Sequence, residues 1–172
     1  MAKINFSINS WLVGDQRECH ASCVKSRLAY TQKGNSMLRN IRQLVDRFYE
    51  IVNGADGDFS EIFTSDFQFG IMKGFPYGGN HNGLIATEKF FEDFSAHFEF
   101  WTVETDRFIE VDDANIVVTG KYISQACSTG TSFEMETVHL WTADNGMLTS
   151  YKHFCDTAIV SKALDHIVPQ YS

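Results

Sequence analysis

The chain has 172 residues, of which 44% are hydrophobic and 14% aromatic, including 15 Phe, and its formal net charge is −8. This length suits one domain with a substantial core and does not favour a second. The acidic balance argues against a nucleic-acid or anionic-membrane partner, because phosphate binding requires a basic surface. The abundance of rings predicts an interior that is either densely packed or hollowed into a pocket for an apolar ligand.

No run of about 18 apolar residues occurs, so we expect no membrane span. The start of the chain is too polar for a secretion signal, and the four Cys are therefore expected to be reduced thiols in the cytoplasm. Cys19, His20 and Cys23 lie close together, but no second cluster at metal-binding spacing follows them. The sequence therefore predicts no metal site. Residues 1–36 are expected to be an N-terminal extension of unknown role.

Residues 37–172 carry the pattern of one folded domain. Apolar residues spaced three and four apart predict an amphipathic helix from Ser36 to Asn53-Gly54. Asp58, with Glu61 three residues later, resembles a capping box and predicts a short helix through Phe63. A strand from Phe67 to Lys73 should follow, with Phe67, Phe69 and Ile71 on one face.

The second half of the chain predicts one helix followed by long strands. The Gly-rich segment 74–83 is expected to be a turn-rich crossing, and an apolar face over Leu84 to Ala96 predicts a helix. Strands are expected at Phe100 to Ile109 and Asn115 to Ala126. A long hairpin should span Thr131 to Thr157, and a closing helix should run from Ala158 to Ile167.

The hairpin should turn at Asn145-Gly146, because this pair suits a two-residue turn with positive φ at both positions. An uninterrupted register then sets Val138 opposite His153, and opposite residues share a face. One face would carry Glu136, Val138, Leu140, Tyr151, His153 and Cys155, and the other His139, Trp141, Lys152, Phe154 and Asp156.

The predicted helices come early in the chain and the antiparallel strands come late. This order predicts an α+β domain in which the helices cover one face of a curved sheet. A resemblance supports this fold. Asp66 entering a strand, Gly83 before a phenylalanine-rich helix, and the ending DNGMLTSYKHFCDT resemble the SnoaL-like branch of the nuclear transport factor 2-like superfamily, over about residues 37–160. The resemblance implies a cone-shaped α+β barrel, in which a curved, mostly antiparallel sheet wraps around N-terminal helices.

The limonene epoxide hydrolases of that superfamily suggest which side chains point into the cone. Their catalytic Asp-Arg-Asp set falls on Gly120, Tyr122 and His153, and their water-holding Tyr and Asn fall on Phe69 and Ile71. Every member of the set is replaced, which disfavours epoxide hydrolysis. The resemblance implies a cavity lined by Phe69, Ile71, Tyr122, Val138, Leu140, Tyr151 and His153. Tyr77, on the Gly-rich loop, is expected at the mouth of this cavity.

These residues predict acid/base chemistry without a metal or organic cofactor. His153 stands where several relatives carry an acidic base, and imidazole exchanges protons near neutral pH. Tyr122 could donate a hydrogen bond to a developing enolate oxygen. The predicted activity is that of a cyclase, isomerase or dehydratase acting on an apolar carbonyl compound.

Other interpretations remain open. His153 could be a structural histidine, and the domain could be a module that binds a small ligand without turnover or one that serves only to dimerise. His139 and Asp156 are expected on the opposite face from the cavity, where Asp156 would cap the closing helix. Met135, Trp141 and Phe154 are predicted on the outer sheet face, where they would form a homodimer interface.

Overall fold

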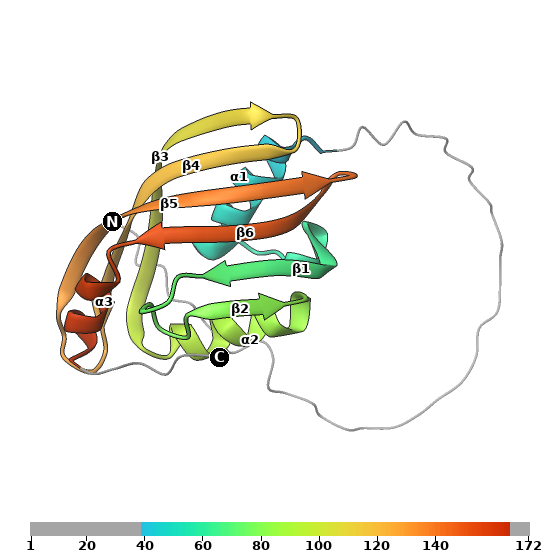
Figure 1. Ribbon diagram of the computed structural model, residues 1–172. Coiled ribbons are helices and arrows are strands. Elements are labelled where there is room, and N and C mark those ends of the chain that lie inside the picture. Colours follow the sequence, from blue (N-terminus) through green and yellow to red (C-terminus); the bar gives the residue numbers. More distant parts are fainter. Residues whose placement is uncertain (1–38, 166–172) are drawn as a thin grey trace, which may run out of the picture.

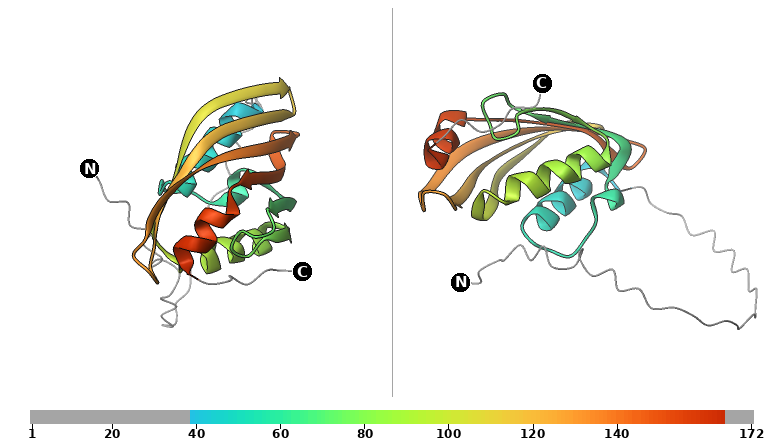
Figure 2. Two further views of the ribbon diagram at one scale, coloured as in Figure 1. Left: turned by 60° about the vertical axis from the view of Figure 1, so that its left-hand side comes forward. Right: turned by 90° about the horizontal axis from the view of Figure 1, so that it is seen from below.

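A computed structural model describes residues 39–165 of the 172-residue chain. Within this range a six-stranded sheet curves over two long helices, and a third helix lies at one end of the sheet (Figure 1). The view from below shows α1 and α2 together on the concave side of the sheet (Figure 2). The predicted α+β cone is therefore confirmed. The extension of residues 1–36 lies outside the described residues.

Helix α1 spans Ile41–Val52 and begins later than predicted. Its N-cap is Asn40, whose side chain accepts a hydrogen bond from the backbone of Gln43, while the Gln43 side chain accepts one from the Asn40 N–H. This reciprocal capping starts the helix, so the predicted start at Ser36 was wrong. The next predicted capping box is present, with Asp58 and Glu61 enclosing a single 3-10 turn, η1, over Phe59–Glu61.

Strand β1 spans Phe63–Ile71 and begins earlier than predicted, directly after η1. The segment expected to be only a crossing contains a further strand, β2, over Gly79–Asn82, which pairs antiparallel with β1. Four residues with one Gly, two Asn and no apolar side chain show no strand pattern by themselves. Helix α2 follows at Leu84–Ser95, close to the predicted range.

The remaining elements are long strands and a closing helix. These are β3 (Phe98–Asp112), β4 (Asn115–Ala126), β5 (Ser132–Asp144), β6 (Met147–Cys155) and α3 (Thr157–Leu164). Asp156 caps α3 as predicted, since its side chain accepts from the Ala158 N–H. The sheet order is β2-β1-β6-β5-β4-β3, and only the β1–β6 pair is parallel among the described strands.

The hairpin turn is confirmed, with φ of 49° at Asn145 and 77° at Gly146. The predicted register is wrong by one residue. Asp144 pairs with Met147 and Ala143 with Leu148, but Thr142 pairs with Ser150, so Thr149 is an extra residue in a β-bulge. Beyond this bulge His153 faces His139, and Val138 faces Phe154. The shift changes which side chains of β5 and β6 share a face.

The corrected register turns Met135, His139 and Trp141 inward, where each is at most 2% exposed. The prediction that Met135 and Trp141 lie on the outer face was therefore wrong. Val138, Leu140 and Phe154 occupy that outer face instead. The core between the sheet and the helices is rich in rings, and Phe48 of α1 packs edge-on against Trp141 at 4.6 Å between ring centroids.

Candidate functional site

A cavity of about 90 Å³ lies between the concave face of the sheet and helices α1 and α2. Rings make most of its wall: Phe48, Phe69, Phe75, Phe90, Phe91, Phe94, Phe98, Phe100, Trp101, Tyr122, His139, Tyr151 and His153. Glu99 and Phe100 at the start of β3 are exposed lining residues, so the cavity meets solvent there. Pockets for drug-sized ligands hold about 300–1,000 Å³, so this cavity is well below that range.

Five of the predicted lining residues do border this cavity: Phe69, Ile71, Tyr122, Tyr151 and His153. Val138 and Leu140 do not, because the bulge places them on the outer face, where they are 37% and 40% exposed. Tyr77 is also absent from the lining. Its hydroxyl lies 2.8 Å from Nε2 of His97, which does not border the cavity either.

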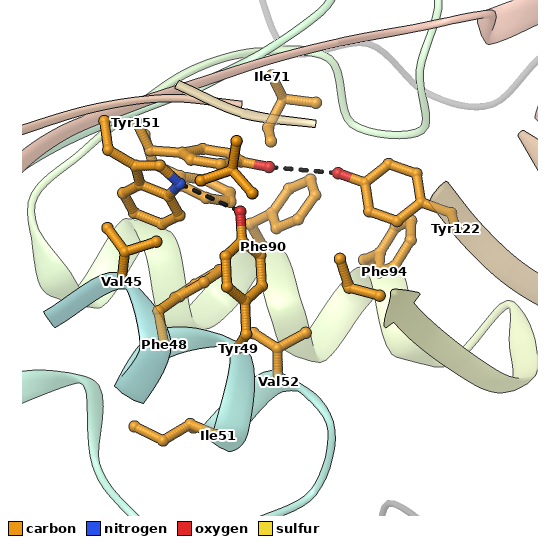
Figure 3. Close-up of a cluster of buried hydrophobic side chains, with 14 of the residues drawn as sticks. Val45, Phe48, Tyr49, Ile51, Val52, Ile71, Phe90, Phe94, Tyr122 and Tyr151 are labelled. Carbon is orange, nitrogen blue, oxygen red and sulfur yellow. Dashed lines mark hydrogen bonds between the residues drawn. The ribbon is translucent and has the colours of Figure 1, made fainter. Parts of the chain in front are cut away.

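The polar centre of the site is the Tyr122 hydroxyl on β4. It lies 2.7 Å from Nε2 of His139, 3.2 Å from the Tyr151 hydroxyl and 3.2 Å from Nδ1 of His153. Figure 3 shows the Tyr122 and Tyr151 hydroxyls directed at one another above α2. A hydroxyl offers one donor and two acceptor sites, so these three neighbours use its full capacity. Tyr122 therefore has no hydrogen bond left for a ligand.

His139 was predicted on the opposite face, but the corrected register makes it the link between this centre and α1. Its Nδ1 lies 2.5 Å from the hydroxyl of Tyr49 in α1, and the Trp141 indole donates to the same hydroxyl at 3.3 Å. The Tyr49 hydroxyl is drawn between helix and sheet in Figure 3. Alternation along β5 correctly put His139 and Trp141 on the same face in the sequence analysis. The bulge in β6 is what shows that this face is turned inward.

His153 is 1% exposed, and its ring meets Phe75 edge-on at 4.7 Å between centroids. Its Nδ1 pairs with Tyr122, whereas its Nε2 is buried without a hydrogen-bond partner in the part of the chain that the structure describes. Burial among rings lowers the pKa of His153 to about 3, because the charged imidazolium loses its hydration. His153 is thus a neutral imidazole at pH 7, with one nitrogen unpaired beside the cavity.

The other groups of this centre are neutral as well. Desolvation raises the pKa of Tyr49, Tyr122 and Tyr151 and lowers the pKa of His139 well below its usual range. The one carboxylate that lines the cavity is Glu99, at its exposed end. The site therefore offers neutral donors and acceptors in an apolar enclosure, where each polar contact is stronger than in water.

Between residues 39 and 165 no group of three or more His, Cys, Asp or Glu is placed to hold a metal ion. Cys19, His20 and Cys23 lie outside the described residues. No helix in residues 39–165 is long and apolar enough to cross a membrane.

Gly120, which was predicted to stand at a catalytic Asp position of the epoxide hydrolases, has a structural reason to lack a side chain. A Cβ at this position would lie 2.2 Å from the Glu104 carbonyl oxygen of β3. The β3–β4 register shifts between Thr105 and Arg107, next to this contact. No carboxylate could occupy position 120 without moving β3.

Comparisons with known proteins confirm the predicted resemblance at the level of the fold. An NTF2-like protein from Burkholderia thailandensis has 23% identity and a TM-score of 0.65, covering 73% of this chain and 98% of its own. A candidate SnoaL-like polyketide cyclase from Jannaschia sp. CCS1 has 19% identity and a TM-score of 0.62, covering 72% and 90%. TerC, co-crystallised with polyporic acid, has 19% identity and a TM-score of 0.60, covering 73% and 95%. No protein-family model and no curated protein matches the chain.

Proposed function

We propose that this protein, whose fold is that of the NTF2-like and SnoaL-like proteins, is a cofactor-independent acid/base enzyme acting on an apolar carbonyl compound as an isomerase, cyclase or lyase. The observation that carries the proposal is Nε2 of His153, a buried nitrogen without a hydrogen-bond partner among residues 39–165, on a ring that lines the cavity. An unpaired buried polar atom is costly in a structural role and useful in a site that awaits a ligand.

In this proposal Nε2 of His153 accepts a proton from the carbon next to the ligand's carbonyl group. Tyr122 keeps the His153 ring oriented through Nδ1, instead of contacting the substrate oxygen as the sequence predicted, because its hydroxyl is already fully hydrogen bonded. The ring-lined wall favours an apolar substrate, and the narrow cavity favours one ring over several.

Three neighbours support a small-molecule role. TerC was crystallised with polyporic acid, and the proteins from Jannaschia sp. CCS1 and Xanthomonas campestris are described as candidate polyketide cyclases. We place the reaction in the cytoplasm, because Cys127 and Cys155, the cysteines of the described range, are free thiols.

The test uses cyclohex-3-en-1-one, a single-ring ketone whose isomerisation to the conjugated ketone is followed by absorbance. We expect the wild type to accelerate this reaction and His153→Gln to lose about 100-fold or more in kcat/KM, the range typical of a catalytic base. His97→Ala is the matched control, because His97 does not line the cavity. Equal rates for the wild type and for well-folded His153→Gln would remove His153 from the mechanism.

The second candidate is a module that binds a ligand without turnover. The observation that favours it is the cavity itself, which is small, closed in by rings and free of buried carboxylates among its lining residues. Saturable binding of cyclohexanone in calorimetry, together with no turnover of any enolisable ketone, would select this function over the enzyme.

We also propose that the chain forms a homodimer through the outer face of the sheet. Val138 and Phe154 are paired across β5 and β6, Leu140 lies two residues along β5, and each of these apolar side chains is 37–40% exposed. Apolar side chains gathered on one sheet face favour a partner. We expect a dimer by light scattering and a monomer for Phe154→Glu. Ile85→Glu, at an exposed site on α2, should remain dimeric, and a monomeric wild type would refute the proposal.

A further inference from the structure

The direction of each hydrogen bond in the buried network can be followed from the Trp141 indole, which can only donate. Trp141 donates to the Tyr49 oxygen, and among residues 39–165 Nδ1 of His139 is the acceptor that lies within reach of the Tyr49 hydroxyl proton, so we assign that proton to the Tyr49–His139 hydrogen bond. Neutral His139 therefore carries its own proton on Nε2 and donates it to Tyr122, at 2.7 Å. The Thr137 hydroxyl donates to the Phe154 carbonyl and so can only accept from the same nitrogen.

One lone pair of the Tyr122 oxygen is thus occupied by His139. Its hydroxyl proton and its second lone pair remain for two neighbours at equal distance, the Tyr151 hydroxyl and Nδ1 of His153, each at 3.2 Å. Tyr122 must donate to one of them and accept from the other. Two arrangements of the protons therefore satisfy the same positions of the heavy atoms.

In the first arrangement Nδ1–H of His153 donates to Tyr122, and Tyr122 donates to Tyr151. Nε2 of His153 then carries a lone pair, and the Tyr151 hydroxyl proton is not used within the network. In the second arrangement Tyr151 donates to Tyr122, and Tyr122 donates to Nδ1 of His153, so Nε2 carries the proton. Each arrangement leaves one donor and one acceptor, and both residues line the cavity.

We infer that His153, Tyr122 and Tyr151 form a neutral proton relay, in which Nε2 of His153 is the base for a ligand's α-carbon and the Tyr151 hydroxyl is the acid for its carbonyl oxygen. This inference rests on the proposed function and adds to it Tyr151 as a catalytic residue and Tyr122 as the bridge. The ligand class is an enolisable ketone, such as a β,γ-unsaturated cyclic ketone.

The protons balance in each step. The α-carbon gives its proton to Nε2, and the electron pair of that C–H bond becomes the new C=C bond of the enol. Nδ1–H passes to the Tyr122 oxygen, the Tyr122 proton passes to Tyr151, and the Tyr151 proton passes to the carbonyl oxygen. The protein is left in its second arrangement. The dienol then returns its O–H proton to Tyr151, and Nε2–H protonates the γ-carbon, which shifts the double bond and restores the first arrangement.

The surroundings of His153 favour a relay over a simple base. Desolvation lowers its pKa to about 3, so a free imidazolium would be costly in this cavity, and no carboxylate contacts its ring among the described residues. A relay avoids that cost, because Nδ1 releases a proton as Nε2 accepts one. The groups facing His153 are Tyr122, His139, Tyr151 and Phe75, none of which is charged at pH 7.

The first test needs no substrate. Nitrogen-15 NMR of the His153 ring should report an average of the two neutral tautomers in the wild type. In Tyr151→Phe the Tyr122 proton has only Nδ1 of His153 left as acceptor, so His153 should hold its proton on Nε2 alone. Ser150→Ala, which removes a hydroxyl from the outer side of the same strand, should behave as the wild type. A single tautomer that does not respond to Tyr151→Phe, or a charged ring at pH 7, would overturn the relay.

The second test is kinetic. With cyclohex-3-en-1-one, Tyr151→Phe should lower kcat about 100-fold or more, and the double variant with His153→Gln should be no slower than either single variant, because the residues act as one unit. An unchanged kcat in Tyr151→Phe would overturn the relay while leaving His153 as the base. Averaged tautomers in a protein without turnover would support proton exchange within the network and refute the enzyme.

Discussion

At the scale of single residues, the site is a buried polar network that contains no charge. Its members come from four elements: Tyr49 from α1, Tyr122 from β4, His139 from β5, and Tyr151 and His153 from β6. Buried polar groups are tolerated when they are hydrogen bonded, and all of these are, except at Nε2 of His153. That exception marks the atom at which a ligand would complete the network.

Stability should depend on pH through His153. Its pKa is about 3 in the folded chain and 6.5 in the unfolded chain, so between these values the unfolded chain binds a proton that the folded chain does not. Its contribution, up to about 5 kcal/mol, is complete above pH 6.5 and is lost as the pH falls toward 3. His139 acts in the same direction. Thermal unfolding should show a smaller loss of Tm on acidification for His153→Phe than for the wild type. Parallel pH profiles would contradict the assignment.

At the scale of elements, two irregularities of the sheet decide the geometry of the site. The bulge at Thr149 sets His139 beside His153, and the register shift of β3 brings its backbone against Gly120. Bulges commonly redirect side chains beside functional sites, and both irregularities adjoin the buried network here. A regular sheet of the same sequence would turn His139 or His153 to the outer face.

Gly120→Ala tests the contact between β3 and β4. The added Cβ would lie 2.2 Å from the Glu104 carbonyl oxygen, which belongs to the backbone and cannot rotate away. We expect the free energy of unfolding, measured by urea denaturation, to fall by about 1–3 kcal/mol, the usual cost of overpacking. Thr119→Ala on the same strand should change it by about 0.5 kcal/mol or less. A loss no larger in Gly120→Ala than in this control would show that β3 moves freely.

At the scale of the whole molecule, the helices and the curved sheet enclose a space that rings nearly fill. Phe94 of α2 stacks on Phe90 and meets Trp101 edge-on at 4.6 Å between centroids, close to the exposed end of the cavity. The cavity of about 90 Å³ is therefore limited by side chains that smaller residues could replace. Ligand size should then follow the size of these rings.

We expect cyclohexanone to raise the Tm of the wild type and the two-ring ketone 2-tetralone to have little effect. Phe94→Leu should reverse this preference, because it enlarges the cavity where it approaches solvent. Ile85→Ala, on the exposed side of the same helix, serves as the control. Binding is measured as the shift in Tm with ligand concentration. Equal stabilisation of the wild type by both ketones would show that the rings move aside without mutation.

Much of the fold followed from local chemistry. The hairpin turn was determined by Asn145-Gly146, and the 3-10 turn by the pair Asp58 and Glu61. The start of α3 was determined by Asp156. Each of these signals acts within a few residues, so it can be read from the sequence. The range of β4 was predicted to the residue, and the resemblance carried in the final hairpin led to the right fold.

The sequence by itself thus determined the order of the elements and the cone that they build, whereas the tertiary structure alone decided which side chains meet inside it. Side chains of a strand alternate with a period of two, so one extra residue, Thr149, exchanges the two faces beyond it. No local sequence signal around Thr149 predicts this bulge. It moved Val138 and Leu140 outward and brought His139 to Tyr122, where the hydrogen bonds of the site converge.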